Sequence, residues 1–143
     1  MTSAQALEGA FKKHPAVFAR LRGRNGVFRE YQALLVPATE YCILPRVDAF
    51  QLGYPEAASD SRTSSPNNLM LASYTGYGRG TRIKIAQVEI GSMSFKDVEF
   101  LAFDTLQAVG FDVVLGLTLL RRTRLDLDFA SGMLRLEKAA DSL

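Results

Sequence analysis

The chain has 143 residues and a formal net charge of +2, from 17 basic and 15 acidic residues. This length fits one compact domain, and 48% hydrophobic with 22% charged residues is the composition of a globular protein that can bury a core. The composition therefore excludes wholesale disorder, and the small charge excess does not predict a nucleic-acid partner. No apolar run approaches the roughly 20 residues that cross a bilayer, so we expect no membrane span.

The N-terminal third predicts a hairpin and a short helix. Residues 3–13 carry Leu7, Ala10 and Phe11 at helical spacing, which indicates a short amphipathic helix or a docked arm. Residues 15–21 and 27–36 are β-compatible and flank an Asn-Gly turn, so they predict a β-hairpin. Residues 45–52 predict a short helix that ends at Gly53.

The rest of the chain predicts further short strands. Residues 56–68 are polar and predict a loop, and residues 69–74 and 81–90 predict strands joined by a glycine-rich tip at 75–80. Additional strands are predicted at 95–103, 111–115, 125–129 and 133–137, with a short helix at 117–122. Many short strands with frequent turn signals are typical of an all-β sandwich or barrel.

Common catalytic and cofactor motifs are missing from the sequence. The spacing of Gly76, Gly78 and Gly80 lacks the Gly-Lys-Ser/Thr ending of a phosphate-binding loop. His14 is the single histidine and no Gly-x-Ser-x-Gly elbow occurs, which argues against a serine or cysteine hydrolase triad. Cys42 lies among apolar residues and is expected in the core, and one cysteine can form neither an intrachain disulfide nor a cysteine zinc site. We therefore expect no metal and no cofactor.

The most informative segment is residues 31–45, with the sequence YQALLVPATEYCILP. It resembles the active-site segment of the retropepsin-like aspartic proteases, the single-lobe retroviral type, in which a strand ending in Ala-Leu leads into Asp-Thr/Ser-Gly-Ala and then an apolar run often closed by proline. Residues 75–80 resemble the tip of the family's flap, residues 90–101 its next strand, and residues 113–120 its apolar-apolar-Gly signature before a short helix. Together these segments cover most of residues 15–136.

The resemblance fails at the catalytic position, where Val36, Pro37 and Ala38 stand for the family's Asp, Thr and Gly. The family's reaction needs two carboxylates, one from each subunit, that share a proton and activate water. Valine has no ionisable group, proline offers neither hydroxyl nor backbone N–H, and alanine obstructs the close approach that glycine permits. The sequence thus predicts a catalytically degenerate member, a pseudoprotease.

Two other acidic residues are candidates to replace the missing catalytic aspartate. Asp104-Thr105 is followed by Leu106 instead of glycine, which indicates a surface turn. Glu40 is better placed, since the family commonly has an acid near this point, and it can act as a salt-bridged or peptide-binding carboxylate or, as an alternative, as a non-standard catalytic acid. Leu117 stands where the family often has a charged or polar residue, which puts the usual ionic bracing of the dimer in doubt.

The resemblance implies an all-β closed barrel of the acid-protease type with one or two short helices and one lobe per chain. The domain would span residues 15–138, after an arm or helix at 1–14 and before a tail at 139–143. It also implies a homodimer in which residues 133–137, together with residues before Pro15, pair between subunits.

The implied site has two parts. The peptide cleft would be lined by Val36, Pro37, Ala38, Thr39 and Glu40. The flap would contain Tyr74, Gly76, Tyr77, Gly78 and Gly80.

The sequence is compatible with three functions. The first is a dimeric module that binds an extended peptide or protein segment by strand addition, the second an active peptidase that uses Glu40, and the third a structural β-barrel subunit. The first residues lack a secretion signal, because Lys12, Lys13 and His14 come where its apolar region should be, so we expect a cytoplasmic protein.

Overall fold

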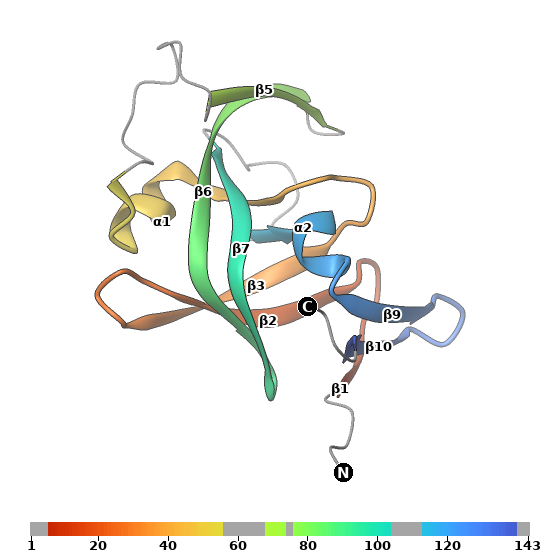
Figure 1. Ribbon diagram of the computed structural model, residues 1–143. Coiled ribbons are helices and arrows are strands. Elements are labelled where there is room, and N and C mark those ends of the chain that lie inside the picture. Colours follow the sequence, from red (N-terminus) through yellow and green to blue (C-terminus); the bar gives the residue numbers. More distant parts are fainter. Residues whose placement is uncertain (1–5, 56–67, 74–75, 104–112, 140–143) are drawn as a thin grey trace.

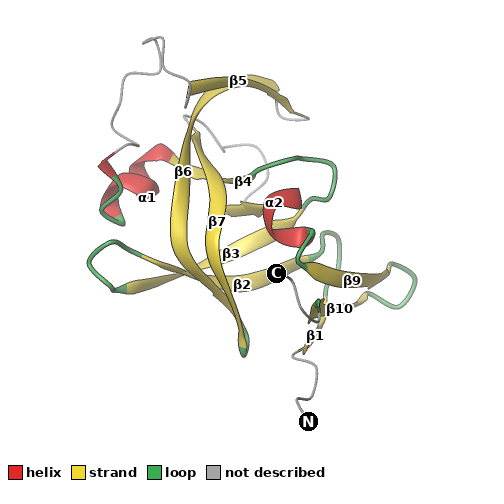
Figure 2. Cartoon of the chain, in the orientation of Figure 1, coloured by secondary structure: helices red, strands yellow, loops and turns green. Residues whose placement is uncertain are grey.

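The computed structural model describes residues 6–55, 68–73, 76–103 and 113–139 (Figure 1). In chain order it contains β1 (Ala6–Ala10), β2 (Ala16–Arg22), β3 (Phe28–Leu35), β4 (Cys42–Pro45), α1 (Arg46–Gln51), β5 (Asn68–Ser73), β6 (Gly76–Ile90), β7 (Met93–Phe103), β8 (Val113–Leu115), α2 (Leu117–Leu120), β9 (Thr123–Asp128) and β10 (Met133–Lys138). Figure 2 shows strands dominating the described chain, with α1 and α2 as short helices beside them. The predicted all-β class is confirmed. No helix among the described residues is long and apolar enough to cross a membrane.

The large sheet closes into a barrel. Its strands follow the order β2-β3-β8-β4-β7-β6-β5, and β6 also pairs with β2, so that six strands of the described chain form a ring and β5 extends from it. β8 is central to the arrangement, because it runs parallel to β3 and antiparallel to β4. The seam between β2 and β6 is short, with Arg20 opposite Glu89 and Leu21 opposite Val88.

The barrel interior is apolar because alternate strand residues point inward. The residues of β2 alternate between buried and exposed positions, as the period of two along a strand requires. Fully buried side chains come from most of the barrel strands: Leu21, Leu44, Ile85, Phe95, Phe100 and Leu115. Each contributes about 1.5–3 kcal/mol through burial of its apolar surface.

The hairpin turn predicted at the Asn-Gly pair is present. Gly26 has φ of 85° between β2 and β3, and the Asn25 Oδ1 accepts a hydrogen bond of 3.0 Å from the Val27 N–H. Gly91 has φ of 60° in the turn that joins β6 to β7. Positive φ favours glycine, so these turns are where the sequence signal was strongest.

Of the two alternatives predicted for the N-terminal segment, a short helix and a docked arm, the structure shows a docked strand and not a helix. β1 pairs antiparallel with β10, and β10 pairs with β9, so these strands make a separate small sheet. Leu7, Leu136 and Leu125 lie in register on the face that packs against the barrel core. The extended form is favoured because the edge of β10 supplies hydrogen-bond partners to the backbone of β1. A helix of so few residues is only marginally stable by itself.

The position of β10 also corrects one prediction about assembly. Residues 133–137 were expected to pair between subunits, but β10 lies in the centre of the small sheet with both edges bonded to its own chain. Its backbone therefore has no edge to offer a second subunit. Of the described strands in this sheet, β1 and β9 have an outer edge.

The hairpin of β5 and β6 extends beyond the barrel (Figure 2). The glycine-rich tip predicted at residues 75–80 is displaced, because Gly76 already pairs with Ser73 and residues 76–80 belong to β6. Glycine was interpreted as a turn signal there, yet the backbone of these residues bonds to β5 as an ordinary strand. Of the predicted loop at 56–68, residues 56–67 lie outside the described residues.

Candidate functional site

The candidate site is built around the loop of residues 36–41, which joins β3 to β4. The Val36 N–H donates to the Leu115 carbonyl at 3.0 Å, and the Thr39 N–H donates to the Val36 carbonyl at 3.3 Å. The N–H groups of Leu117 and Thr118 donate to the carbonyls of Thr39 and Glu40, each at 2.9 Å. The loop is therefore fixed by backbone bonds to the end of β8 and the start of α2.

Gly116 lets these two segments approach closely. A Cβ atom at this position would lie 2.3 Å from the Tyr41 carbonyl oxygen and 2.7 Å from that of Thr39. Such distances are far below van der Waals contact with rigid backbone, so a larger residue would push the loop away from α2. The sequence motif of two apolar residues and a glycine thus has a direct steric cause.

Cys42 and Thr118 form a polar contact beneath the loop. The Thr118 hydroxyl accepts a hydrogen bond from the Cys42 N–H at 3.2 Å and donates to the Glu99 carbonyl at 2.8 Å. The Gly116 N–H donates to the Cys42 Sγ at 3.3 Å. Burial raises the pKa of the Cys42 thiol to about 11. Cys42 is fully buried, which confirms the prediction that it belongs to the core.

The three residues at the expected catalytic position present an apolar surface. Val36 is half-buried and packs against Ile43, Phe103 and Val114, a small cluster separate from the barrel core. Pro37 and Ala38 are exposed, and Thr39 is half-buried. The side chains of Val36, Pro37 and Ala38 carry no ionisable group.

Glu40 is the acidic residue of this loop, and it is held by an ion pair. Its carboxylate lies 2.7 Å and 3.2 Å from two guanidinium nitrogens of Arg121, at the end of α2. The structure therefore places Glu40 in a salt bridge, which is one of the roles that the sequence leaves open. Arg121 is not among the predicted site residues, although its position four residues after Leu117 places it one helical turn further along α2.

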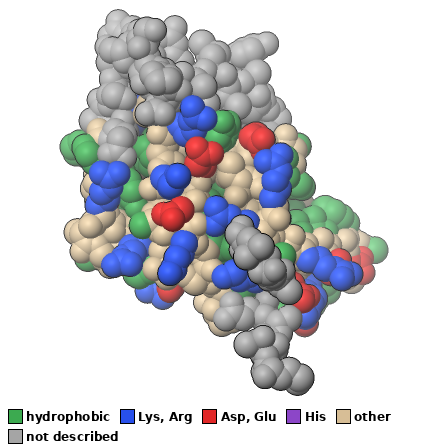
Figure 3. Space-filling view, in the orientation of Figure 1, with side chains coloured by type: hydrophobic (Ala, Val, Ile, Leu, Met, Phe, Trp, Pro, Cys, Tyr) green, Lys and Arg blue, Asp and Glu red, His purple; other side chains and the backbone are tan. Residues whose placement is uncertain are grey.

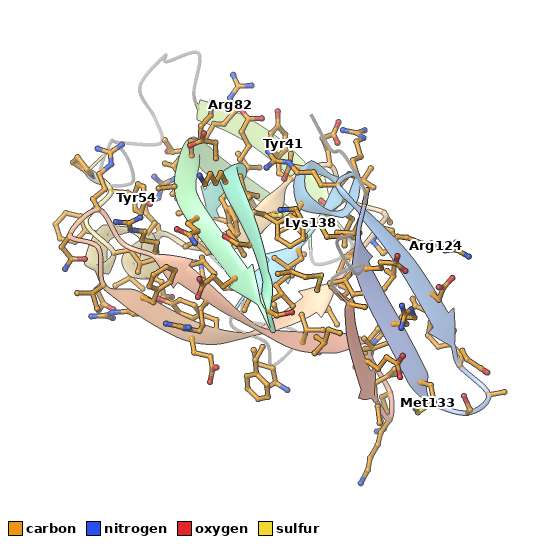
Figure 4. All side chains as sticks on the ribbon, turned by 60° about the horizontal axis from the view of Figure 1, so that its bottom comes forward. Tyr41, Tyr54, Arg82, Arg124, Met133 and Lys138 are labelled. Carbon is orange, nitrogen blue, oxygen red and sulfur yellow. The ribbon has the colours of Figure 1, made fainter. Side chains whose placement is uncertain are left out.

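The loop also contacts the long hairpin. The guanidinium of Arg82, on β6, lies at 3.5 Å from the Tyr41 hydroxyl, and Figure 4 shows both side chains at the same end of the barrel. Thr81, which precedes Arg82 on β6, accepts a hydrogen bond of 2.7 Å from Arg46. These contacts join β6 to the loop and to the start of α1.

The structure describes four of the five predicted flap residues. Gly76, Tyr77, Gly78 and Gly80 lie on β6, where they pair with β5. Tyr74 and the pair Asp104-Thr105 lie outside the described residues.

Charged side chains are dispersed over the face seen in Figure 3. Lys and Arg side chains there alternate with Asp and Glu instead of forming one basic patch. Among the described residues, Arg20 and Glu89 form an ion pair at 2.9 Å.

Comparison with known proteins identifies the fold. A crystal structure of a retropepsin-like aspartic protease from Rickettsia conorii is similar to this chain, with a TM-score of 0.63 and 21% sequence identity over 98% of each chain. The crystal structure of the retroviral protease-like domain of Ddi1 from Leishmania major is similar with a TM-score of 0.53 and 18% identity, over 91% of this chain and 90% of that chain. No protein-family model matches the sequence, and neither does any curated protein. The chain has the single-lobe fold of the retropepsin-like aspartic proteases.

Proposed function

We propose that this protein is a catalytically inactive relative of the retropepsin-like aspartic proteases that binds extended peptides as a homodimer. The observation that carries the proposal is Val36, which occupies the first loop position after β3 and packs against Ile43, Phe103 and Val114. In the proteases this position would supply the carboxylate that activates water. A valine there can neither accept a proton from water nor polarise a peptide carbonyl.

The neighbouring residues support loss of the reaction. Pro37 has neither a hydroxyl nor a backbone N–H, so it lacks the donors with which a threonine would brace the loop, and the Cβ of Ala38 obstructs the close approach that a glycine permits. The Glu40 carboxylate is engaged with Arg121 at 2.7 Å. Arg121 would compete with a catalytic water for the Glu40 oxygens, both of which are held in this ion pair.

Peptide binding remains compatible with this loop and hairpin. An extended chain can add to a strand edge through backbone hydrogen bonds, which need no catalytic acid. We assign the cleft to Val36, Pro37, Ala38, Thr39 and Glu40, and the covering flap to the hairpin of β5 and β6, with Gly76, Tyr77, Gly78 and Gly80 on β6. A single lobe provides half of such a cleft, which is the argument for a twofold dimer.

Restoring the protease motif tests the proposal. The purified protein should not cleave an unfolded protein substrate between about pH 3 and pH 7, whereas the triple variant Val36→Asp, Pro37→Thr, Ala38→Gly should gain cleavage that an aspartic-protease transition-state analogue inhibits. Cleavage by the unmodified protein that is lost in Glu40→Gln would establish the peptidase alternative and refute the proposal. The matched control is Glu30→Gln, which removes an exposed carboxylate of β3 outside the loop.

A second measurement separates a binding module from a structural subunit. The protein should bind members of a random peptide library, and Tyr77→Ala should weaken this binding at least about tenfold without lowering the melting temperature of the barrel, since the backbone pairing of β6 with β5 is kept. Absence of any bound peptide would favour the structural alternative.

A further inference from the structure

A groove of about 590 Å³ lies outside the loop described above. It runs between the segment that links β1 to β2 and the outer face of the hairpin of β2 and β3, and its lining includes Phe11, Lys12, Lys13, Phe18 and Gln32. This volume is within the range of about 300–1,000 Å³ that is typical of ligand sites. None of the lining residues belongs to the candidate cleft at residues 36–40.

The walls of the groove are preformed. The Phe11 N–H donates to the Gly132 carbonyl at 2.8 Å, and the Phe11 ring packs edge-on against Phe129 at 5.3 Å between ring centres. At the other end of the link, the Pro15 carbonyl accepts a hydrogen bond of 2.9 Å from the Leu35 N–H. Residues 12–14 are therefore held between two fixed points, which lowers the entropy lost when a partner binds.

The floor of the groove contains an exposed aromatic ring. Phe18 is 62% exposed and lies opposite Gln32 in the strand register. The next outward residue of β2, Arg20, is satisfied by its ion pair with Glu89 and by its position over the Phe28 ring at 4.7 Å. Single exposed apolar residues are common, but Phe18 lies in a concave surface shared with Phe11, where a second apolar side chain would bury both rings.

The rim of the groove is positively charged, and no carboxylate among the described lining residues compensates this charge. Lys12 and Lys13 are exposed and form no ion pair with any described residue, whereas Arg20, Arg121 and Arg135 each pair with a glutamate. The lining residues, all within the described part of the chain, include no Asp or Glu. An occupant that complements the groove must combine a large apolar group with negative charge.

We propose that this groove binds an extended acidic peptide segment that places a phenylalanine or leucine side chain between Phe11 and Phe18 and its carboxylates against Lys12 and Lys13. Two lysines are too few for a nucleic-acid surface, whose affinity rests on many phosphate contacts. The apolar floor also favours a side chain over a bare polyanion. This surface acts independently of the proposed peptide cleft.

Fluorescence polarisation tests the proposal with a labelled decapeptide of serine and glutamate that has one central phenylalanine. Saturable binding is expected, and replacing the phenylalanine by serine, or the glutamates by lysines, should weaken it at least about tenfold, a loss of about 1.4 kcal/mol. Raising the salt concentration should also weaken it, because the lysines are exposed. Equal binding of the lysine-containing peptide, or no saturable binding, would overturn the proposal.

Protein variants localise the binding. Phe18→Ser and the double variant Lys12→Glu, Lys13→Glu should each weaken binding at least about tenfold. Two matched controls should stay within about twofold: Phe50→Ser, an aromatic residue on α1 that is 58% exposed, and Lys84→Glu with Lys96→Glu, which are exposed on β6 and β7. Equal losses in variants and controls would contradict the assignment. Self-association that Phe18→Ser abolishes, without peptide binding, would instead show that a second copy of the chain fills the groove.

The outcome is distinguishable from that of the proposed cleft. Variants of Val36 or Glu40 should leave binding of the acidic peptide unchanged, and variants of Phe18 should leave binding of cleft peptides unchanged. Loss of acidic-peptide binding in a Val36 variant that remains folded would show that the two surfaces are one site, and would refute the separate groove.

Discussion

Thr118 connects backbone segments that are distant in the sequence and that meet beneath the loop of residues 36–41. Its hydroxyl bonds to the Cys42 N–H on β4 and to the Glu99 carbonyl on β7. Because both partners are part-buried, water cannot readily replace the hydroxyl. The position of the loop thus depends on one side chain of a short helix.

Thr118→Val should destabilise the protein by about 1–3 kcal/mol, because valine keeps the shape but leaves the Cys42 N–H and the Glu99 carbonyl without this partner. Thr118→Ser, which keeps the hydroxyl, should recover most of the loss. Urea denaturation of the three proteins measures the difference. Equal stability of the valine variant and the parent would show that the hydroxyl contributes nothing.

Cys42 predicts a pH dependence. Burial raises the pKa of its thiol from the ordinary value of 9.0 to about 11 in the folded protein. The unfolded chain therefore releases this proton from pH 9 upward while the folded chain retains it, so this contribution to stability is present below pH 9 and lost as the pH rises towards 11. The free energy of unfolding should fall by up to about 3 kcal/mol more in the parent than in Cys42→Ala. Parallel curves for the two proteins would contradict the assignment.

At the scale of elements, the segment after α1 reinforces the short seam of the barrel. The Tyr54 hydroxyl donates to the Arg22 carbonyl at 2.8 Å, at the end of β2, and accepts from the Ala86 N–H at 3.1 Å, on β6 (Figure 4). The Arg24 N–H also donates to the Leu52 carbonyl at 2.8 Å. These bonds extend the contact between β2 and β6 beyond the few residues that pair directly.

Tyr54→Phe should therefore loosen the seam. The variant should lose about 1–3 kcal/mol of stability, since the Ala86 N–H and the Arg22 carbonyl lose their shared partner. Hydrogen exchange should rise most at Ala86 and in the neighbouring part of β2. Tyr41→Phe serves as the control, because its 3.5 Å contact with Arg82 is long. Uniform exchange across the whole barrel would argue against a local seam.

The elements that the sequence predicted well are those fixed by local signals. Asn25-Gly26 and Gly91 mark turns that only a few backbone shapes allow, and the alternation along β2 reports one buried face. β1 was predicted less well, because its extended form depends on β10, more than a hundred residues away. At residues 76–80 the glycine pattern suggested a turn, but pairing with β5 determines the structure there.

The candidate site also combines features that the sequence predicted with features that it did not. The position of the loop at residues 36–41 followed from the order of motifs, since an apolar strand, a gap and a second apolar run leave few alternatives. The Arg121 pair with Glu40 joins residues 81 positions apart, so no local pattern announced it. The sequence showed that Leu117 carries no charge, but it did not indicate that Arg121 forms an ion pair with Glu40.

At the scale of the whole molecule, the two faces of the small sheet differ in polarity. Its inner face is apolar, whereas its outer face aligns Glu8, Arg135 and Asp126 in register, with Arg135 at 2.6 Å from Glu8. Figure 4 shows this sheet projecting from the barrel, with Met133 near its far end. A polar outer face suits solvent, so the assembly surface of the proposed homodimer should include the loop of residues 36–41.

A single substitution at that loop tests the assembly. In a twofold dimer with Val36 at the axis, Val36→Asp would bring two carboxylates together, and their repulsion would raise the pKa of one of them. The dimer would then hold a proton that free monomers release, so dimerisation of the variant should weaken as the pH rises from about 4 to 7, whereas that of the parent should change much less. Sedimentation equilibrium across this range measures the effect, with Val27→Asp as a control at the exposed turn between β2 and β3. A variant that dimerises as well at pH 7 as at pH 4 would show that the two loops do not meet, and a parent that is monomeric at high concentration would exclude the dimer itself.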